Sequence, residues 1–129
     1  MMEIQIILYI VSALILLFYI RRLIQRARMK EYSPKQVAGM LKDDSIILLD
    51  VRSTEERSQQ HIKGSLHIPV NDLQLRLKTL EKYRLREIVC YCHSGSRSFS
   101  AALMLQKHGF QAVNMKGGIA EWNYQNLKL

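Results

Sequence analysis

An uncharged apolar run near the N-terminus constrains this chain more than any other feature. Residues 4–20 read IQIILYIVSALILLFYI, and none of these seventeen positions carries a charged side chain. As an α-helix the run would span about 26 Å, slightly less than the ~30 Å hydrocarbon core of a bilayer. Leu23 and Ile24 can extend the apolar length, and Tyr19 suits the membrane interface as an amphipathic ring. The run predicts one transmembrane helix.

The residues on either side of this run argue against two alternatives. A secretory signal peptide carries basic residues before its apolar stretch and small residues at a cleavage site after it. Here Glu3 precedes the run, Arg21 and Arg22 follow it, and no Ala-x-Ala pattern occurs. A buried core helix would show a polar stripe with a period of about 3.6 residues, which the run lacks. We therefore favour a membrane anchor over a signal peptide or a core helix.

Basic residues cluster directly after the apolar run, at Arg21, Arg22, Arg26, Arg28 and Lys30. Positively charged flanks stay on the cytoplasmic side, so the N-terminus is expected to face outward. The sequence thus predicts a single-pass protein of the cell membrane whose C-terminal domain is cytoplasmic. The same five cations either contact anionic lipid or serve orientation alone.

The distribution of charge divides the chain into two parts. The formal net charge is +8, and residues 1–30 hold five basic residues and one acidic residue. Residues 31–129 hold fourteen basic and ten acidic residues, which are interleaved. A nucleic-acid-binding protein would show a dense basic stripe with aromatic residues nearby, so no nucleic-acid partner is expected. We assign residues 1–30 to the transmembrane helix with its basic juxtamembrane segment, and residues 31–129 to one folded domain.

Residues 31–129 alternate predicted helices with short apolar strands. Ser33 followed by Pro34 starts a first helix, and Ser53 can cap a short second one. Strands are predicted over residues 46–51, 65–68, 88–92 and 111–115, with further helices over 72–80 and 98–108 and a last helix after Gly117. Because residues 46–51 are largely apolar on both sides, the strand belongs in a covered parallel sheet. The order of elements predicts a three-layer α/β domain with a mainly parallel sheet.

The residues that can carry chemistry follow the second buried strand. Cys92 ends this strand, a glycine-containing loop follows, and a helix begins after it. Ligands of open α/β sheets bind beyond the carboxyl ends of the strands. Backbone N–H groups of such a loop, the N-terminus of the helix and the charge of Arg97 would all lower the pKa of the Cys92 thiol. This setting is typical of a nucleophilic cysteine that carries a negatively charged adduct.

Four stretches of the domain resemble single-domain rhodaneses, a family of sulfurtransferases. They are Leu-Asp-Val-Arg at 49–52 with a glutamate at 55 or 56 behind it, His-Ile-x-Gly-Ser-x-x-Ile-Pro at 61–69, Tyr-Cys-x-Ser-Gly-x-Arg-Ser at 91–98, and Gly-Gly-x-x-x-Trp at 117–122. They occur in the order of the family and cover the chain from about Tyr32 to Leu127. The resemblance predicts a rhodanese-like fold for the whole domain.

The resemblance also implies a reaction. Cys92 would take a sulfane sulfur from a small-molecule donor such as thiosulfate, hold it as a persulfide and pass it to cyanide or to a thiol acceptor. The surrounding substrate-binding residues would be His93, Ser94, Gly95, Ser96, Arg97 and Ser98. Amides from residues 93–97 would surround the outer sulfur, and the hydroxyls of Ser94 and Ser98 would bond within the loop. The reaction requires neither a metal ion nor an organic cofactor.

Two other functions stay open. Cysteine phosphatases and arsenate reductases use a similar loop, but the phosphatase motif has five residues between cysteine and arginine, whereas four separate Cys92 from Arg97 here. A shorter loop forms a cradle that suits a single sulfur better than a phosphoryl group. Alternatively, the domain is a catalytically silent, membrane-tethered binding module. The sequence does not identify a protein partner.

Several conspicuous residues have simpler structural roles. Cys90 is expected to be a small buried core residue, with a resolving role in redox chemistry as the alternative. Asp50 and Arg52 should pair and brace neighbouring loops. For His61 the resemblance to rhodaneses implies a hydrogen bond within its loop rather than a role as a base. Trp122 should pack the last helix against the core.

Overall fold

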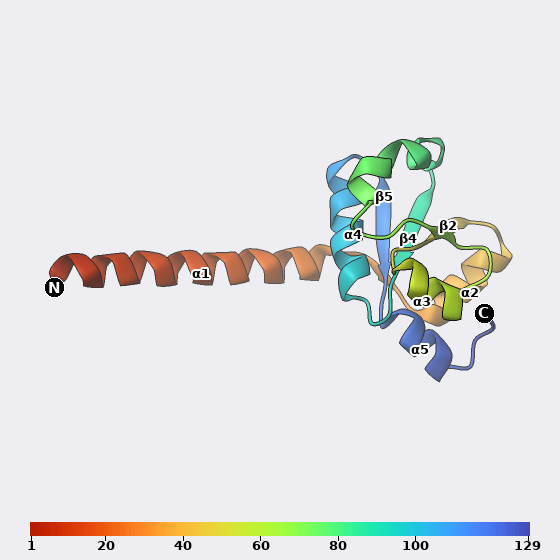
Figure 1. Ribbon diagram of the computed structural model, residues 1–129, viewed down its shortest axis with the longest axis horizontal. Helices are drawn as coiled ribbons and strands as arrows, with labels where there is room; N and C mark the ends of the chain where they lie inside the picture. Colours follow the sequence, from red (N-terminus) through yellow and green to blue (C-terminus); the bar gives the residue numbers. More distant parts are fainter.

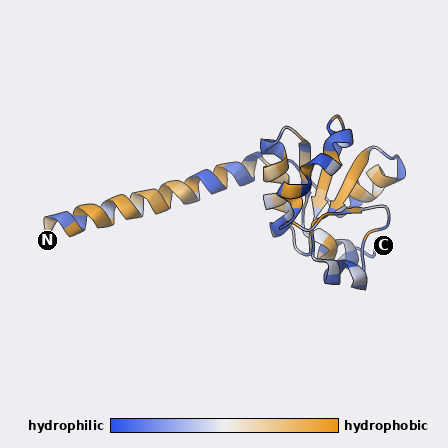
Figure 2. Cartoon of the chain, turned by 45° about the horizontal axis from the view of Figure 1, so that its top comes forward, coloured by the Kyte–Doolittle hydropathy of each residue, from blue (hydrophilic) through white to orange (hydrophobic).

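A computed structural model describes all residues from 1 to 129, and its N-terminal helix stands apart from the domain (Figure 1). Helix α1 (Met2–Arg28) is 27 residues long, and none of its residues is buried. It is the one helix long and apolar enough to cross a membrane. Figure 2 shows its apolar character along most of its length and hydrophilic residues where it approaches the domain.

The domain is built on a five-stranded sheet in which every pair of neighbouring strands is parallel. The strands lie in the order β1-β5-β4-β2-β3. Their bounds are Glu31–Tyr32 (β1), Ile46–Asp50 (β2), Leu66–His67 (β3), Glu87–Tyr91 (β4) and Gln111–Met115 (β5). The predicted parallel α/β sheet is therefore confirmed. Strand β1 was not predicted, because two residues carry no periodicity and only the pairing with β5 makes them a strand.

Helices cover both faces of the sheet and give the predicted three layers (Figure 1). Helix α4 (Ser96–Lys107) and the 3₁₀ helix η1 (Leu73–Tyr83) supply apolar side chains to one buried cluster, which includes Leu49, Cys90 and Cys92. Helices α2 (Pro34–Lys42) and α5 (Gly118–Tyr124) supply the other, which includes Tyr91 and Trp122. Alternate residues of β4 thus enter opposite layers, as a strand requires.

The two predicted helix starts are confirmed in atomic detail. The Ser33 hydroxyl accepts the N–H of Gln36, and the Gln36 side chain accepts the N–H of Ser33, which forms a capping box. The Ser53 hydroxyl accepts the N–H of Glu56 at the start of α3 (Thr54–Gln59). Each cap satisfies N–H groups that a helix start would otherwise leave unpaired.

The helix predicted over residues 72–80 is a 3₁₀ helix over Leu73–Tyr83 and not an α-helix. Its regular geometry is interrupted at Arg76, where φ is −114°. Leu73 and Leu80 are both buried, whereas Leu75 is 89% exposed. Leu73 and Leu80 are seven positions apart, and both belong to the same buried cluster. The irregular residue Arg76 lies between them. The leucine spacing predicted a helix but not this departure from α-helical geometry.

Only two residues, Met29 and Lys30, connect helix α1 to strand β1. Met29, directly after the helix, is buried in the cluster beneath α4, and the side chain of Gln106 contacts its sulfur. The carbonyl of Lys30 accepts the N–H of Asn114, and the Lys30 ammonium pairs with Glu87 at 2.9 Å. The basic end of α1 is therefore continuous with edge strand β1.

Candidate active site

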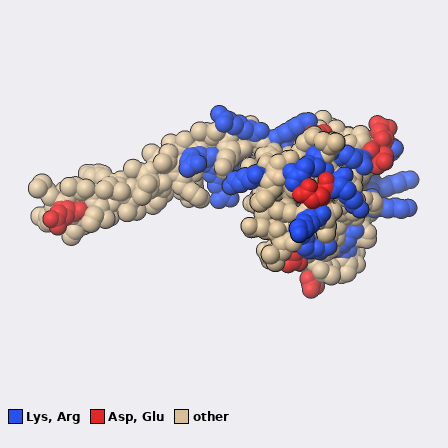
Figure 3. Space-filling view, turned by 90° about the horizontal axis from the view of Figure 1, so that it is seen from above, with Lys and Arg blue, Asp and Glu red and all other residues tan.

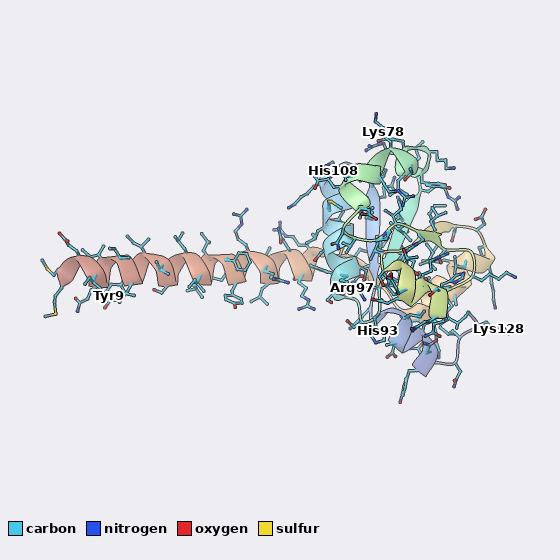
Figure 4. All side chains as sticks on the ribbon, viewed as in Figure 1. Tyr9, Lys78, His93, Arg97, His108 and Lys128 are labelled. Atoms are coloured by element: carbon cyan, nitrogen blue, oxygen red, sulfur yellow. The ribbon has the colours of Figure 1, made fainter.

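Cys92 lies directly after β4, the middle strand of the sheet, at the edge where the parallel strands end. The loop that follows it leads into α4, whose N-cap is Gly95. Figure 4 shows the side chains of His93 and Arg97 at this end of the domain, away from Lys78 and His108. The fold therefore places the predicted loop where ligands of open α/β sheets bind.

The Cys92 sulfur is buried and accepts hydrogen bonds from the loop. The N–H of Gly95 donates to Sγ at 3.1 Å, and the Ser98 hydroxyl lies 3.3 Å from Sγ. Burial alone raises the pKa of the Cys92 thiol, but hydrogen bonds from the Ser98 side chain and from the backbone of Ser98, Gly95 and Ser94 outweigh it, so the net pKa is lowered. The site thus favours a thiolate, which is the nucleophilic form.

Glycines make this loop geometry possible. Gly95 has φ of 102°, in the left-handed region that side chains with a Cβ rarely adopt. At the start of α5, the N–H groups of Ile119 and Ala120 donate to the carbonyls of Cys92 and His93 at 2.9 and 3.0 Å. A Cβ on Gly118 would overlap these same two carbonyl oxygens. The Gly-Gly pair therefore lets α5 hold the loop carbonyls on its own side, while amides of the loop point at sulfur.

A side chain from β5 joins the loop to edge strand β1. Asn114 is buried, and its Oδ1 accepts the Ser98 hydroxyl at 2.6 Å. Its Nδ2 donates to the Gly95 carbonyl at 3.2 Å and to the Glu31 carboxylate at 2.8 Å. Reasoning from the sequence missed Asn114. Its signal was a polar residue in the otherwise apolar centre of QAVNM, which indicates a buried group that needs partners.

Arg97 is committed to a carboxylate partner. Its two terminal nitrogens each lie 2.9 Å from one carboxylate oxygen of Glu56, on α3. The hydrogen bond to Arg97 holds the pKa of Glu56 below its usual range, and Glu56 raises that of Arg97. The charge of Arg97 was expected to lower the pKa of the Cys92 thiol, and this pairing with Glu56 offsets part of that charge.

The other predicted loop residues differ in their contacts. His93, Ser94 and Ser96 are exposed, and the Ser94 side chain makes no hydrogen bond, contrary to the expectation for its hydroxyl. Of the amides expected around the sulfur, that of Gly95 donates to it at 3.1 Å, and the backbone of Ser94 also helps to lower the pKa of the Cys92 thiol. A cavity of about 340 Å³ beside His93 and Arg97 and another of about 450 Å³ beside Ser94–Ser96 flank the loop.

The predicted pair of Asp50 and Arg52 is confirmed and braces the neighbouring loops. Arg52 donates to both carboxylate oxygens of Asp50 at 3.0 and 2.8 Å, and to the carbonyl of Gln60. The Tyr91 hydroxyl also donates to Asp50 at 2.8 Å. Burial raises the pKa of Asp50, but the bonds to Arg52 outweigh it and leave the pKa lowered. His61 bonds the carbonyl of Arg57 at 3.3 Å, so its partner lies in helix α3 and not, as expected, within its own loop.

The second cysteine is placed differently from Cys92. Cys90 is fully buried, and burial together with the neighbouring Cys92 raises its pKa to about 12. Both cysteines are free thiols, and both belong to the core cluster beneath α4. The prediction of Cys90 as a small core residue is confirmed, and Trp122, 2% exposed, is likewise a core residue.

Comparison with known proteins identifies the family. Residues 33–125 match the rhodanese-like domain family. The chain belongs to this family. It is 31% identical over 87 residues to a sulfurtransferase of Allochromatium vinosum, an alignment that covers 67% of this chain and 79% of the relative. It is 29% identical over 73 residues to thiosulfate sulfurtransferase PspE of Escherichia coli, covering 57% of this chain and 70% of the relative.

Relatives of different length share the rhodanese-like domain. YrkF of Bacillus subtilis, a candidate sulfur carrier protein by name, is 41% identical over 81 residues, which are 62% of this chain and only 43% of YrkF. Among solved structures, a rhodanese-related protein of Thermoplasma volcanium aligns with a TM-score of 0.71 at 27% identity, covering 77% of this chain and 95% of that chain. The rhodanese-like fold and membership of a family with sulfurtransferase homologues are therefore established.

Proposed function

We propose that this protein is a membrane-anchored sulfurtransferase that carries sulfane sulfur on Cys92. The observation that carries the proposal is the hydrogen bonding of the buried Cys92 sulfur by the Gly95 N–H at 3.1 Å and the Ser98 hydroxyl at 3.3 Å. These donors favour a thiolate over a thiol, and a thiolate is needed for attack on a sulfane sulfur. The family's sulfurtransferase homologues support the same reaction.

The proposed reaction proceeds in two displacements. The Cys92 thiolate attacks the outer sulfur of a donor such as thiosulfate, a new S–S bond forms, and sulfite leaves with the electron pair of the broken bond. An acceptor thiolate or cyanide then attacks the outer sulfur of the Cys92 persulfide and releases the Cys92 thiolate. The Gly95 amide and the Ser98 hydroxyl, which already bond Sγ, stabilise the negative charge of the persulfide. Neither step requires an external oxidant or reductant.

The direct test is the mass of the protein after incubation with thiosulfate. We expect the gain of one sulfur atom on the peptide that contains Cys92, removable by cyanide with formation of thiocyanate. Cys92→Ser should abolish both, whereas Cys90→Ser should keep them. Sulfur found only on Cys90 would contradict the assignment. No loading of the unmutated protein by thiosulfate or by organic persulfides would favour the silent binding module, and faster turnover of an aryl phosphate would favour a phosphatase.

We further propose that α1 crosses the cell membrane with the domain on the cytoplasmic side. The apolar stretch of α1 is unburied, and its basic end lies beside the domain (Figure 3). Arg21, Arg22, Arg26, Arg28 and Lys30 would then lie at the level of the anionic lipid headgroups. Lys30 is paired with Glu87 and Arg26 lies against Phe99, so Arg21, Arg22 and Arg28 are the cations left for lipid contact. A membrane-bound partner or a sulfur acceptor near the membrane would explain such an anchor.

Protease protection tests this orientation. In sealed inside-out vesicles, whose cytoplasmic face is exposed, protease should digest the domain and leave an N-terminal fragment. In right-side-out spheroplasts the domain should be protected. Digestion of the domain in spheroplasts but not in inside-out vesicles would contradict the proposed orientation. Recovery of the protein in the soluble fraction would contradict the proposed anchor.

A further inference from the structure

A cavity of about 450 Å³ lies between the loop that follows Cys92 and the C-terminal end of helix α1. Ser94, Gly95 and Ser96 form its wall toward Cys92, and Lys116, just after β5, forms another part of the lining. Arg26, from the last turn of α1, also lines it. The family match begins at residue 33, so Arg26 belongs to a part of this chain outside the rhodanese-like domain.

The charges in this cavity are unbalanced. Neither Arg26 nor Lys116 forms a salt bridge, in contrast to Arg97, which Glu56 neutralises. The one acidic lining residue is Glu31, whose carboxylate is already bonded by the Asn114 amide at 2.8 Å. Two cations against one carboxylate leave a net positive charge, beside the positive N-terminal end of α4. The cavity therefore suits an anionic ligand.

Arg26 is held at this place by its own contact with Phe99 and by the packing of Met29. Its guanidinium stacks 5.8 Å from the centre of the Phe99 ring, and Phe99 itself lines the cavity. Three residues later, the buried side chain of Met29 fixes the end of α1 to the domain. The cation is thus positioned by packing and not by a mobile tether.

The volume of the cavity indicates the size of the ligand. A cavity of this volume falls in the range of about 300–1,000 Å³ that holds organic small molecules, whereas thiosulfate has only five heavy atoms. We propose that this cavity binds the organic part of an anionic low-molecular-weight thiol, whose persulfide is a sulfur donor to Cys92. This inference rests on the proposed sulfurtransferase function.

The proposed step is balanced without a further reactant. The Cys92 thiolate attacks the outer sulfur of the donor R–S–SH, a bond forms between Sγ and that sulfur, and the bond between the two donor sulfurs breaks. The organic thiolate R–S⁻ leaves with the electron pair, and Cys92 becomes the persulfide. Arg26 and Lys116 bind the carboxylate or phosphate groups of R and so hold the donor next to the loop.

The test compares a charged with a neutral donor on the full chain in a neutral detergent. Glutathione persulfide carries two carboxylates, whereas 2-mercaptoethanol persulfide carries none. In the variant Arg26→Ala Lys116→Ala we expect KM for glutathione persulfide to rise about tenfold, equivalent to about 1.4 kcal/mol, with kcat nearly unchanged. KM for 2-mercaptoethanol persulfide should change less than about twofold.

Two further variants separate a local site from a general effect of charge. Lys78→Ala Lys107→Ala removes the same number of charges from exposed positions away from the loop, and should leave both KM values unchanged. Arg26→Lys Lys116→Arg keeps the charges and should largely retain binding of glutathione persulfide. If KM for glutathione persulfide is the same in the unmutated protein and in the variant Arg26→Ala Lys116→Ala, the inference is wrong. The proposed sulfurtransferase function would still stand in that case. Absence of transfer from any donor would instead overturn the proposed function.

Discussion

The Ser98 hydroxyl lies 2.6 Å from Oδ1 of Asn114 and 3.3 Å from Sγ of Cys92. A hydroxyl has one proton, so it can donate fully to only one of these two acceptors at a time. When Cys92 is a thiolate or a persulfide anion, its negative charge strengthens the hydrogen bond from the Ser98 hydroxyl to sulfur. When Cys92 is a neutral thiol, the Ser98 hydroxyl donates to Oδ1 of Asn114 instead. The ionisation of Cys92 is therefore linked to a side chain on β5.

Removing this hydroxyl should make Cys92 harder to ionise. In Ser98→Ala the thiolate loses a donor at 3.3 Å, so the pKa of Cys92 should rise. Loading with sulfur should consequently require higher pH. The measurement is the rate of alkylation by iodoacetamide as a function of pH, with Ser100→Ala, exposed on the same helix, as the control. An unchanged profile in Ser98→Ala would show that the hydroxyl does not act on the thiol.

A charge at position 114 should disturb the same network from its other end. In the unmutated protein, Nδ2 of Asn114 donates to the Glu31 carboxylate and to the Gly95 carbonyl. Asn114→Asp keeps an oxygen near Ser98 but replaces this donor with a second carboxylate oxygen. Repulsion among these acceptors should lower the free energy of unfolding by about 1–3 kcal/mol and raise the pKa of Cys92. Chemical denaturation and pH-dependent alkylation measure these two effects. Asn71→Asp, at an exposed position, should change neither.

The glycine at the start of α5 should not tolerate even a methyl group. In Gly118→Ala the new Cβ would overlap the carbonyl oxygens of Cys92 and His93, at a backbone with φ of 62°. We expect loss of sulfur loading and a free energy of unfolding lower by at least about 2 kcal/mol. Gly39→Ala, on α2 with no atom within 4 Å of the new Cβ, should instead leave stability unchanged or improve it by up to about 1 kcal/mol. Normal loading by Gly118→Ala would contradict the close packing of α5 against the loop.

Releasing Arg97 from its partner should make the thiol easier to ionise. Glu56→Gln removes the carboxylate that neutralises Arg97, so more positive potential acts on Cys92 and its pKa should fall. The pair is more than one-third exposed, at 38% and 37%, so its loss should lower the free energy of unfolding by less than about 1 kcal/mol. Glu55→Gln, which is exposed and unpaired, is the control for alkylation and denaturation. A higher pKa in Glu56→Gln would show that Glu56 acts by orienting Arg97.

The pKa values of the two cysteines are shifted in opposite directions, so the two thiols should ionise at different pH. The pKa of Cys92 is lowered, so the thiolate and its reactivity appear as pH rises and persist above that pKa. Burial raises the pKa of Cys90 to about 12, so Cys90 stays a neutral thiol through the ordinary pH range. Iodoacetamide at pH 8 should therefore modify Cys92 well before Cys90, as peptide mass spectrometry would show. Faster labelling of Cys90 would contradict this ordering.

The sequence by itself determined the features that depend on neighbouring residues. Three kinds of feature are set by residues close together in the chain. They are the uncharged run at 4–20, the helix caps at Ser33 and Ser53, and the apolar stretches of β2, β4 and β5. The loop after Cys92 is likewise a contiguous motif. These features were sufficient to predict a long apolar N-terminal helix, a parallel α/β domain and the place of the thiol.

Only the tertiary structure decided which distant residues meet that thiol. The register of β5 between β1 and β4 brings Asn114 to Ser98 and Glu31, and the position of α3 brings Glu56 to Arg97. The packing of Met29 brings Arg26 to the cavity beside the loop. Sequence spacing carries no information about such contacts, because they follow from strand order and helix packing. The fold thus supplied the partners that set the charge and the surroundings of Cys92.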